Sequence, residues 1–381
     1  MKVHSLNHNN QTARSGKWSA WIALLLLLTF TDCSEVIDLN TEDLGGQLVI
    51  YGRITNGTLG NVVEVSRTTA NGQAPQPVSG AVVRVIGEGG VQGAYTESTT
   101  DLGTYELNPG SIQGVIGQAY HIEVSLPNGA SYASRPEVMP AISARDSLYF
   151  NIEIIEAEGA NGTAIERDVI RIFADTEIFD PRPDLYLKWS VEEVYSFKQA
   201  VLPRHNFPFY SALTCYMTND LEDQRILLYD GFELNATGIF GQSVVDRVID
   251  ENFRGTHYFN FIQQTLTQEA FEFWKSVDKN ANRVGSIFDL PPGKIGNNLY
   301  NVNDPDERIL GYFEVTSIDS ARLKVTNREI NRFYNEPCPL NPEVNFLPLM
   351  CYRCLQRYYD PECLDCRVLH NSSYDRPPYF N

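Results

Sequence analysis

Short runs in which apolar and polar residues alternate recur along this chain, and they constrain its fold more than any other feature. In AYHIEVSL, the apolar residues Tyr120, Ile122, Val124 and Leu126 fall on one face, because successive side chains of a strand point to opposite sides. The segment LYLKWSV, residues 185–191, has the same period. The pattern predicts a mainly β protein whose strands place one face in a core and the other toward solvent.

The turn residues between these runs divide the chain into two predicted domains. Residues 46–140 carry short strands separated by turns every 8 to 12 residues or so, which is typical of a small Ig-like or transthyretin-like β-sandwich. Met139-Pro140-Ala141 marks the boundary. Residues 141–381 keep the β character but have longer loops, and this predicts a second, larger β-rich domain.

One segment of the second domain has a helical period instead. Thr267 is a good N-cap residue, and Ala270, Trp274, Val277 and Ala281 follow at spacings of three and four residues. We therefore predict an amphipathic helix at about residues 267–284 that packs on a sheet.

The N-terminus has the layout of an export signal. Basic residues precede an apolar run, residues 18–30, which is too short to cross a bilayer as a helix of about 20 residues. We predict that residues 1–32 are a signal peptide and are removed.

Cys33 directly follows this apolar run, as in the lipobox of bacterial lipoproteins. We predict that Cys33 is lipidated and that residues 33–45, which are polar, tether the protein to a membrane. The alternative is an ordinary secreted protein in which the position of Cys33 has no role.

The other cysteines include two CxxC pairs in CYRCLQRYYDPECLDC, a spacing that also occurs in zinc sites. An exported chain is exposed to oxidising surroundings, so an even set of cysteines favours disulfides over zinc. Six cysteines allow 15 pairings, and the sequence does not choose among them. We predict that a cysteine-rich C-terminal segment, residues 338–366, is held by disulfides. The candidate cysteines are Cys215, Cys338, Cys351, Cys354, Cys363 and Cys366.

Motifs for catalysis are missing from the sequence. It contains no GxSxG, no GxxxxGK[ST] and no HExxH. The adjacent carboxylates Glu192 and Glu193 are weak evidence for glycosidase chemistry in so acidic a chain. We predict a protein that is not an enzyme, with no catalytic residue, cofactor or metal site. The net charge of −18 also argues against nucleic acid as a partner.

Two loops carry residues of interest. NVNDPDE offers oxygen ligands from Asn301, Asn303, Asp304 and Asp306 that could hold calcium, although a simple acidic turn explains them better.

The second loop, PRHNFPFYSALTCY, concentrates aromatic residues beside two prolines. Exposed, stiff aromatics are a common binding surface, so His205, Phe207, Phe209 and Tyr210 form a candidate binding loop. Packing in the core is the alternative.

The segment FEFWKSVDKNANRVGSIFDLPPGKIGNNLYNVNDPDERILGYFEV, together with LVIYGRITN and Cys33, resembles the DUF4249 lipoproteins of Bacteroidota. The elements SIFDLPP, GN and LGYF are its most specific parts. The N-terminal strands also resemble transthyretin-like or carboxypeptidase-regulatory-like modules. The DUF4249 resemblance implies a place beside TonB-dependent outer-membrane receptors.

We therefore predict an outer-membrane lipoprotein, lipid-anchored and on the cell surface, that helps a TonB-dependent receptor to capture a nutrient. A structural or adhesive surface protein is one alternative. A hydrolase acting on glycan or peptide is the other.

Overall fold

A computed structural model describes residues 46–58, 60–69, 73–158, 162–200, 213–221, 226–234, 236–281, 295–335, 337–338 and 359–380. The described chain is mainly β, as predicted, with few helices. None of the helices in these ranges is long and apolar enough to cross a membrane.

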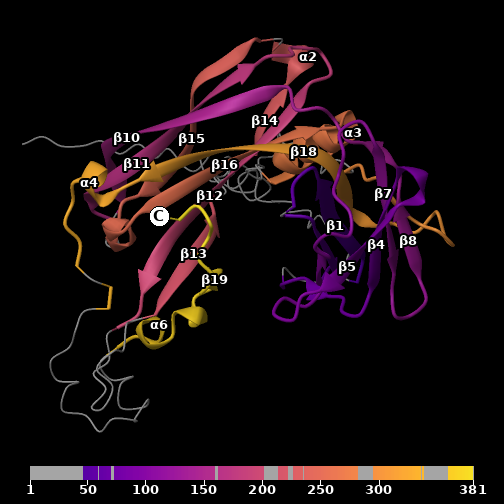
Figure 1. The fold of residues 1–381 in the computed structure, drawn as a ribbon, viewed down its shortest axis with the longest axis horizontal. Coiled ribbons are helices and arrows are strands. Elements are labelled where there is room, and N and C mark those ends of the chain that lie inside the picture. The colour runs from indigo at the N-terminus through magenta and orange to yellow at the C-terminus, as the bar shows by residue number, and fades with distance from the viewer. Residues whose placement is uncertain are drawn as a thin grey trace, which may run out of the picture. The chain divides into compact units, whose positions relative to one another are not determined.

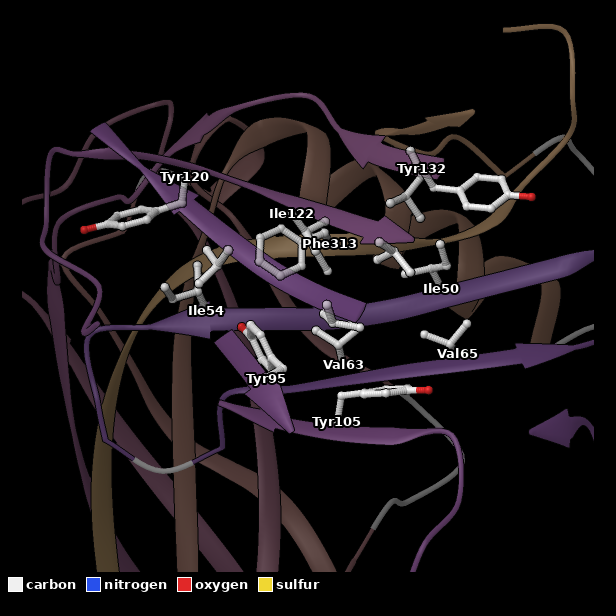
Figure 2. Close-up of a cluster of buried hydrophobic side chains, with 14 of the residues drawn as sticks. Ile50, Ile54, Val63, Val65, Tyr95, Tyr105, Tyr120, Ile122, Tyr132 and Phe313 are labelled. Atoms are coloured by element: carbon white, nitrogen blue, oxygen red, sulfur yellow. The ribbon is translucent and has the colours of Figure 1, made fainter. Parts of the chain in front are cut away.

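The N-terminal strands surround a hydrophobic core of their own, and we call this part of the fold the sandwich. They are β1 (Leu48–Thr55), β2 (Val62–Arg67), β3 (Gln76–Pro77), β4 (Val82–Gly87), β5 (Gln92–Glu97), β6 (Thr104–Leu107), β7 (Ala119–Ser125), β8 (Ser131–Ser134) and β9 (Glu137–Val138). Alternate residues of these strands meet in one core, where Tyr120, Ile122 and Val124 are buried as their period predicts. Figure 2 shows Tyr120 and Ile122 in this core.

The later strands, apart from β17, form a central sheet and a second layer. They are β10 (Ala144–Glu158), β11 (Ala164–Ile178), β12 (Tyr186–Lys198), β13 (Thr214–Asp220), β14 (Leu227–Asp230), β15 (Gly238–Val248), β16 (His257–Leu266), β17 (Leu299–Asn301), β18 (Leu310–Val325) and β19 (Ser372–Ser373). The central sheet has the order β18-β16-β12-β13-β19, and β10-β11-β15 forms a three-stranded sheet. The apolar faces of these two sheets pack together around Leu187, Trp189 and Phe261.

The sandwich is completed by strands that come from the far end of the chain. β17 pairs with β8, and the first half of β18 pairs in parallel with β1, where Val49 lies opposite Leu310. Phe313 of β18 lies in the sandwich core beside Ile50 and Ile122 (Figure 2). The sandwich therefore differs from the predicted block of residues 46–140, because its strand β1 pairs with residues beyond position 300.

The strand β18 belongs to both sheets. Residues 310–316 pair with β1, and residues 317–325 pair antiparallel with β16, so one long strand joins the sandwich to the central sheet (Figure 1). Gly311 has φ of 98°, and a Cβ atom there would lie 2.0 Å from the carbonyl oxygen of Ile50. Only glycine fits so close to β1 with this backbone conformation, which explains the glycine of the LGYF element.

The helices of the described chain are short except for α3. The α-helices are α2 (Gly231–Leu234), α3 (Gln268–Ala281), α4 (Asn327–Ile330) and α6 (Pro361–Leu364), and the 3-10 turns are η2 (Glu88–Gly90), η3 (Glu251–Arg254) and η5 (Cys366–Val368). α3 is the predicted amphipathic helix.

Helix α3 covers the face of the central sheet opposite to the second layer. Its Phe271 stacks on Tyr186 of β12 with ring centres 4.6 Å apart, and Phe273 packs near Tyr312 of β18. The prediction that the second face of β12 points to solvent was therefore wrong. Tyr186 and Lys188 each retain only 8% exposure because the helix lies over them.

The start of α3 yields a first prediction. The Thr267 hydroxyl accepts a hydrogen bond from the Ala270 amide at 3.2 Å and donates one to Glu137 at 2.7 Å. The change Thr267→Ala removes a helix cap and a donor to a buried carboxyl group, so we expect it to lower the free energy of unfolding by about 2 kcal/mol. Urea denaturation measures this loss. Thr267→Ser keeps both hydrogen bonds and is the matched control, and equal losses in both variants would contradict the capping role.

Candidate functional site

A cavity of about 600 Å³ lies where the sandwich, the central sheet and helix α3 meet. Strands β1 and β2, strands β12, β13 and β16, and α3 all contribute to its walls. A cavity of this volume is large enough for a small organic ligand. We take it as the candidate functional site.

The floor of the cavity is one face of the central sheet. Lys188, Ser190 and Glu192 alternate along β12 and so share this face. On the neighbouring strand β16, Gln264 lies opposite Lys188 and Ile262 lies opposite Ser190. The period-2 pattern of two adjacent strands thus brings these five side chains to one surface.

An aromatic wall stands at the Lys188 end of the floor. Trp274 of α3 meets Tyr51 of β1 edge to face, with ring centres 5.8 Å apart and planes at 86°. The Lys188 Nζ atom lies 3.5 Å from the centre of the Trp274 ring, a close cation–π contact. The helix and the sandwich therefore both contribute an aromatic ring to this end of the cavity.

A buried carboxyl group holds the aromatic wall in place. Glu314 of β18 has no exposed surface. It accepts hydrogen bonds from the Tyr51 hydroxyl at 3.1 Å, from Trp274 Nε1 at 2.5 Å and from Gln264 Nε2 at 3.1 Å. Burial, followed by the charge of Glu314, raises the pKa of Tyr51 well above its usual range, so Tyr51 stays protonated and continues to donate. Glu314 thus orients three side chains of the cavity.

Charged groups line the cavity unevenly. The lining includes two cationic side chains and four carboxylates, which gives an excess of two negative charges when all are ionised. These residues are Arg53, Lys188, Glu64, Glu192, Asp220 and Asp278.

The carboxylates of β12 and β13 oppose each other directly. Glu192 pairs with Asp220 across the strands, and like charges in this position repel. Burial, and next the charge of Asp220, raise the pKa of Glu192, although a hydrogen bond from Asn260 and the charge of Arg53 counteract them. This end of the cavity therefore carries negative charge that the described protein groups only partly compensate.

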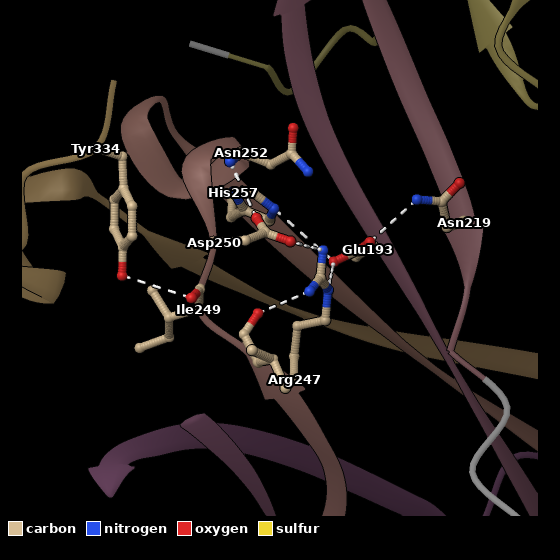
Figure 3. A network of polar contacts seen from close by, with 9 residues as sticks. Glu193, Asn219, Arg247, Ile249, Asp250, Asn252, His257 and Tyr334 are labelled. Carbon is tan, nitrogen blue, oxygen red and sulfur yellow. Dashed lines mark hydrogen bonds and ion pairs between the residues drawn. The ribbon is translucent and has the colours of Figure 1, made fainter. Parts of the chain in front are cut away.

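A second polar cluster lies on the other face of β12. The Glu193 carboxylate, which is 2% exposed, accepts hydrogen bonds from Arg247 Nε at 2.9 Å and Asn219 Nδ2 at 3.0 Å (Figure 3). Arg247 also pairs with Asp250 at 2.9 Å. Burial lowers the pKa of Arg247, but these two carboxylates outweigh it and the pKa is raised. The cluster is a compensated ion-pair network, and it fixes β15 to β12.

His257 lies beside this network and is fully buried. Its ring is stacked between Phe253, with centres 3.9 Å apart, and Tyr195, at 4.8 Å. Burial, followed by the nearby charge of Arg247, lowers the pKa of His257 to about 3, so the ring is neutral at physiological pH. It packs as an aromatic ring within the core.

The adjacent carboxylates Glu192 and Glu193 do not converge. Successive residues of a strand point to opposite faces, so Glu192 enters the cavity while Glu193 joins the Arg247 network. This geometry removes the pair as a glycosidase candidate.

Two disulfides hold the C-terminal segment, and one of them ties it to the central sheet. Cys215 of β13 is bonded to Cys366, and Cys338 is bonded to Cys363. Four of the predicted disulfide cysteines are thus paired. Neither bond lies within a CxxC motif, and the bonded thiols of the second motif are not available to zinc. No cluster of three metal-binding side chains occurs in the described ranges.

Several predicted site residues lie outside the described residues. They are Cys33, Cys351, Cys354, His205, Phe207, Phe209 and Tyr210.

The NVNDPDE loop is a turn held by its own side chains. The Asn301 side-chain oxygen accepts hydrogen bonds from the amides of Asn303 at 2.8 Å and Asp304 at 3.2 Å, and Asp304 in turn accepts from the amide of Asp306 at 3.3 Å. Asn301 also donates to Glu307. Asp304 and Glu307 therefore stabilise the turn through these hydrogen bonds.

The cavity itself is not foreseen from the sequence, but two signals point to it in retrospect. Glu314 sits between Phe313 and Val315 in the otherwise largely apolar stretch LGYFEV, which marks a buried carboxyl group that needs partners. Lys188 and Glu192 lie on the same face of β12 as Tyr186, an aromatic residue that is covered rather than exposed.

The chain is a mainly β protein with a cavity of about 600 Å³ where the sandwich, the central sheet and helix α3 meet. The chain belongs to the DUF4249 family, a domain of unknown function, whose model matches residues 34–322. Searches of curated proteins and of solved structures found no match.

Proposed function

We propose that this chain is a lipid-anchored, non-enzymatic binding protein of the outer membrane that helps a TonB-dependent receptor to capture a nutrient. The observation that carries the binding role is the cavity of about 600 Å³, whose polar floor and aromatic wall suit recognition of a small molecule. The apolar run before Cys33 and the family resemblance support the anchor and the receptor.

The arrangement of the cavity favours binding over catalysis. Its aromatic wall is fixed by hydrogen bonds to Glu314, so the site is organised before a ligand arrives. A preformed site loses less conformational entropy when it binds. A protein that collects scarce nutrients for a receptor gains affinity from such rigidity.

The anchor is tested by changing Cys33. We expect Cys33→Ala to abolish incorporation of labelled fatty acid and to move the protein from the outer-membrane fraction to the soluble fraction, because the lipid supplies the attachment. Ser34→Ala is the control, since it changes the neighbouring residue and leaves Cys33 in place. Lipid labelling that persists in Cys33→Ala would contradict the anchor.

The receptor is tested by affinity purification of the tagged protein from detergent-solubilised outer membranes. We expect mass spectrometry to identify a TonB-dependent receptor in stoichiometric amount. An unrelated tagged lipoprotein from the same membranes is the control. Recovery of the chain with no receptor above that control would contradict the proposal.

A further inference from the structure

We propose that Tyr379 of the C-terminal segment is a positioning residue for the cavity, because it holds Asn260 and Asn260 in turn holds Glu192. This inference deepens the proposed binding role and rests on it. It makes the C-terminal segment a support of the binding site, although no described residue of that segment lines the cavity.

The end of the described chain lies on the sheet face that forms the cavity floor. Residues 375–380, which we call the strap, follow β19, and β19 pairs with β13 at the edge of the central sheet (Figure 1). Phe380 is buried and packs with Val194 of β12 and Tyr258 of β16. Val194 and Glu192 are two residues apart on β12, so they share one face. The strap therefore covers the sheet beside the acidic end of the cavity.

Tyr379 of the strap is placed over β16 and β18 by contacts of its ring. The ring lies against the guanidinium group of Arg322, with the Arg322 Cζ atom 3.4 Å from the ring centre. It also meets Tyr258 edge to face, with ring centres 5.4 Å apart. The hydroxyl oxygen of Tyr379 then accepts a hydrogen bond from Asn260 Nδ2 at 3.0 Å. These ring contacts fix the position of the hydroxyl group on Asn260.

Asn260 is a buried amide that is held at both ends. Its Oδ1 atom accepts a hydrogen bond from Arg322 Nε at 2.6 Å. A guanidinium group only donates, so the amide oxygen faces Arg322 and the amide nitrogen faces Tyr379. That nitrogen carries a second hydrogen atom. Glu192 lies directly opposite Asn260 across β12 and β16, and its carboxylate accepts this second hydrogen.

The hydrogen bond from Asn260 acts on the charge of Glu192. Glu192 is half-buried, and burial, followed by the charge of Asp220 across the strands, raises its pKa. The hydrogen bond from Asn260 opposes this rise in pKa more strongly than the charges of Arg53 and Arg322 do. The orientation of Asn260 therefore helps to keep Glu192 ionised where it lines the cavity.

The strap is kept near this face by a covalent link. The Cys215–Cys366 disulfide bonds β13 to η5, a few residues before β19. A substitution at Tyr379 leaves this link and the buried Phe380 unchanged. The strap therefore remains docked when only the Tyr379 hydroxyl group is removed.

The test is Tyr379→Phe in the full mature protein, which removes the hydroxyl group and keeps the ring on Arg322. We expect the pKa of Glu192, measured by 13C NMR with labelled glutamate carboxyl carbons, to rise by about 0.5 to 1 pH unit. The reason is that Asn260 loses one of the two groups that orient it, so its hydrogen bond to Glu192 weakens. Glu192→Gln identifies the Glu192 resonance, because that signal disappears from its spectrum.

Tyr374→Phe is the matched control. It makes the same chemical change in the same segment, but the Tyr374 hydroxyl group contacts Gln199 and Asp365 and not Asn260. We expect the pKa of Glu192 to stay at its wild-type value in this variant. A purely structural effect of losing a tyrosine hydroxyl group would appear in both variants.

A double variant tests whether Tyr379 acts through Asn260. Asn260→Leu keeps most of the volume and removes the donor, so the pKa of Glu192 should rise at least as far as in Tyr379→Phe. Adding Tyr379→Phe to Asn260→Leu should then produce no further rise, because the residue that connects Tyr379 to Glu192 is absent.

Three results would overturn the inference. The first is a pKa of Glu192 that is unchanged or lower in Tyr379→Phe. The second is an equal rise in Tyr374→Phe. The third is a full additional rise when Tyr379→Phe is added to Asn260→Leu. None of these measurements needs a ligand, the lipid anchor or the receptor, so their outcome is separate from that of the membrane experiments.

Discussion

Removal of the Cys215–Cys366 disulfide is expected to lower the free energy of unfolding by about 5 kcal/mol. The two cysteines are 151 residues apart, so the bond closes a long loop and strongly restricts the unfolded chain. It also fixes the C-terminal segment to β13, where Cys366 packs beside Phe197 and Met217. The effect combines the lost restriction of the unfolded state with loosened packing at the edge of the central sheet.

The measurement is guanidinium chloride denaturation of the double variant Cys215→Ala, Cys366→Ala, which leaves no unpaired partner. The double variant Cys338→Ala, Cys363→Ala is the comparison. Its bond spans only 25 residues, and the same reasoning gives a loss of about 3.5 kcal/mol. A larger loss for the shorter loop would contradict the argument from loop length.

Truncation of the buried carboxyl group in Glu314→Ala is expected to cost about 4 kcal/mol of unfolding free energy. The change leaves the donors of Tyr51, Trp274 and Gln264 without their acceptor and opens a void beneath the cavity wall. Each buried donor that loses its partner is destabilising, and the void adds a packing loss. The same variant should lower ligand affinity, because Trp274 is no longer held against Tyr51.

Thermal and urea denaturation measure this effect, with Trp fluorescence as a second reading because Trp274 changes its surroundings. Glu314→Gln is the matched variant. It keeps the volume and one acceptor oxygen but turns an amide toward donors, so we expect a smaller loss of about 2 kcal/mol. A loss below 1 kcal/mol in Glu314→Ala would show that water replaces the carboxyl group without cost.

Local patterns were sufficient to predict much of the fold. The alternation of Tyr120, Ile122 and Val124 fixes which face of β7 is buried, because the period of a strand leaves no other choice. The stripe that contains Ala270 and Trp274 identified α3, and Thr267 marked its first turn. These features depend on neighbours in the sequence.

Features that depend on distant residues could not be predicted in the same way. The pairing of β1 with β18 joins residues about 260 positions apart, and alternation says nothing about which strands become neighbours. The alternation in LYLKWSV predicted that the second face of β12, which carries Lys188, points to solvent. In the fold, Lys188 lies under Trp274 and Glu192 lines the cavity. The sequence likewise allowed many cysteine pairings. The fold selects among them, because it places β13 beside the C-terminal segment that carries Cys366.

The shared strand β18 has a consequence for the order of folding. The sandwich core takes Phe313 and Val315 from this strand, so its N-terminal strands lack a full core until residues near 315 are available. Contacts between residues so far apart in sequence form slowly, because a long loop must close before they contribute. Until then, the edge of β1 is open to pairing with other chains. The strands made first are thus among the last to be completed, and the chain depends on protection from aggregation until its C-terminal third has arrived.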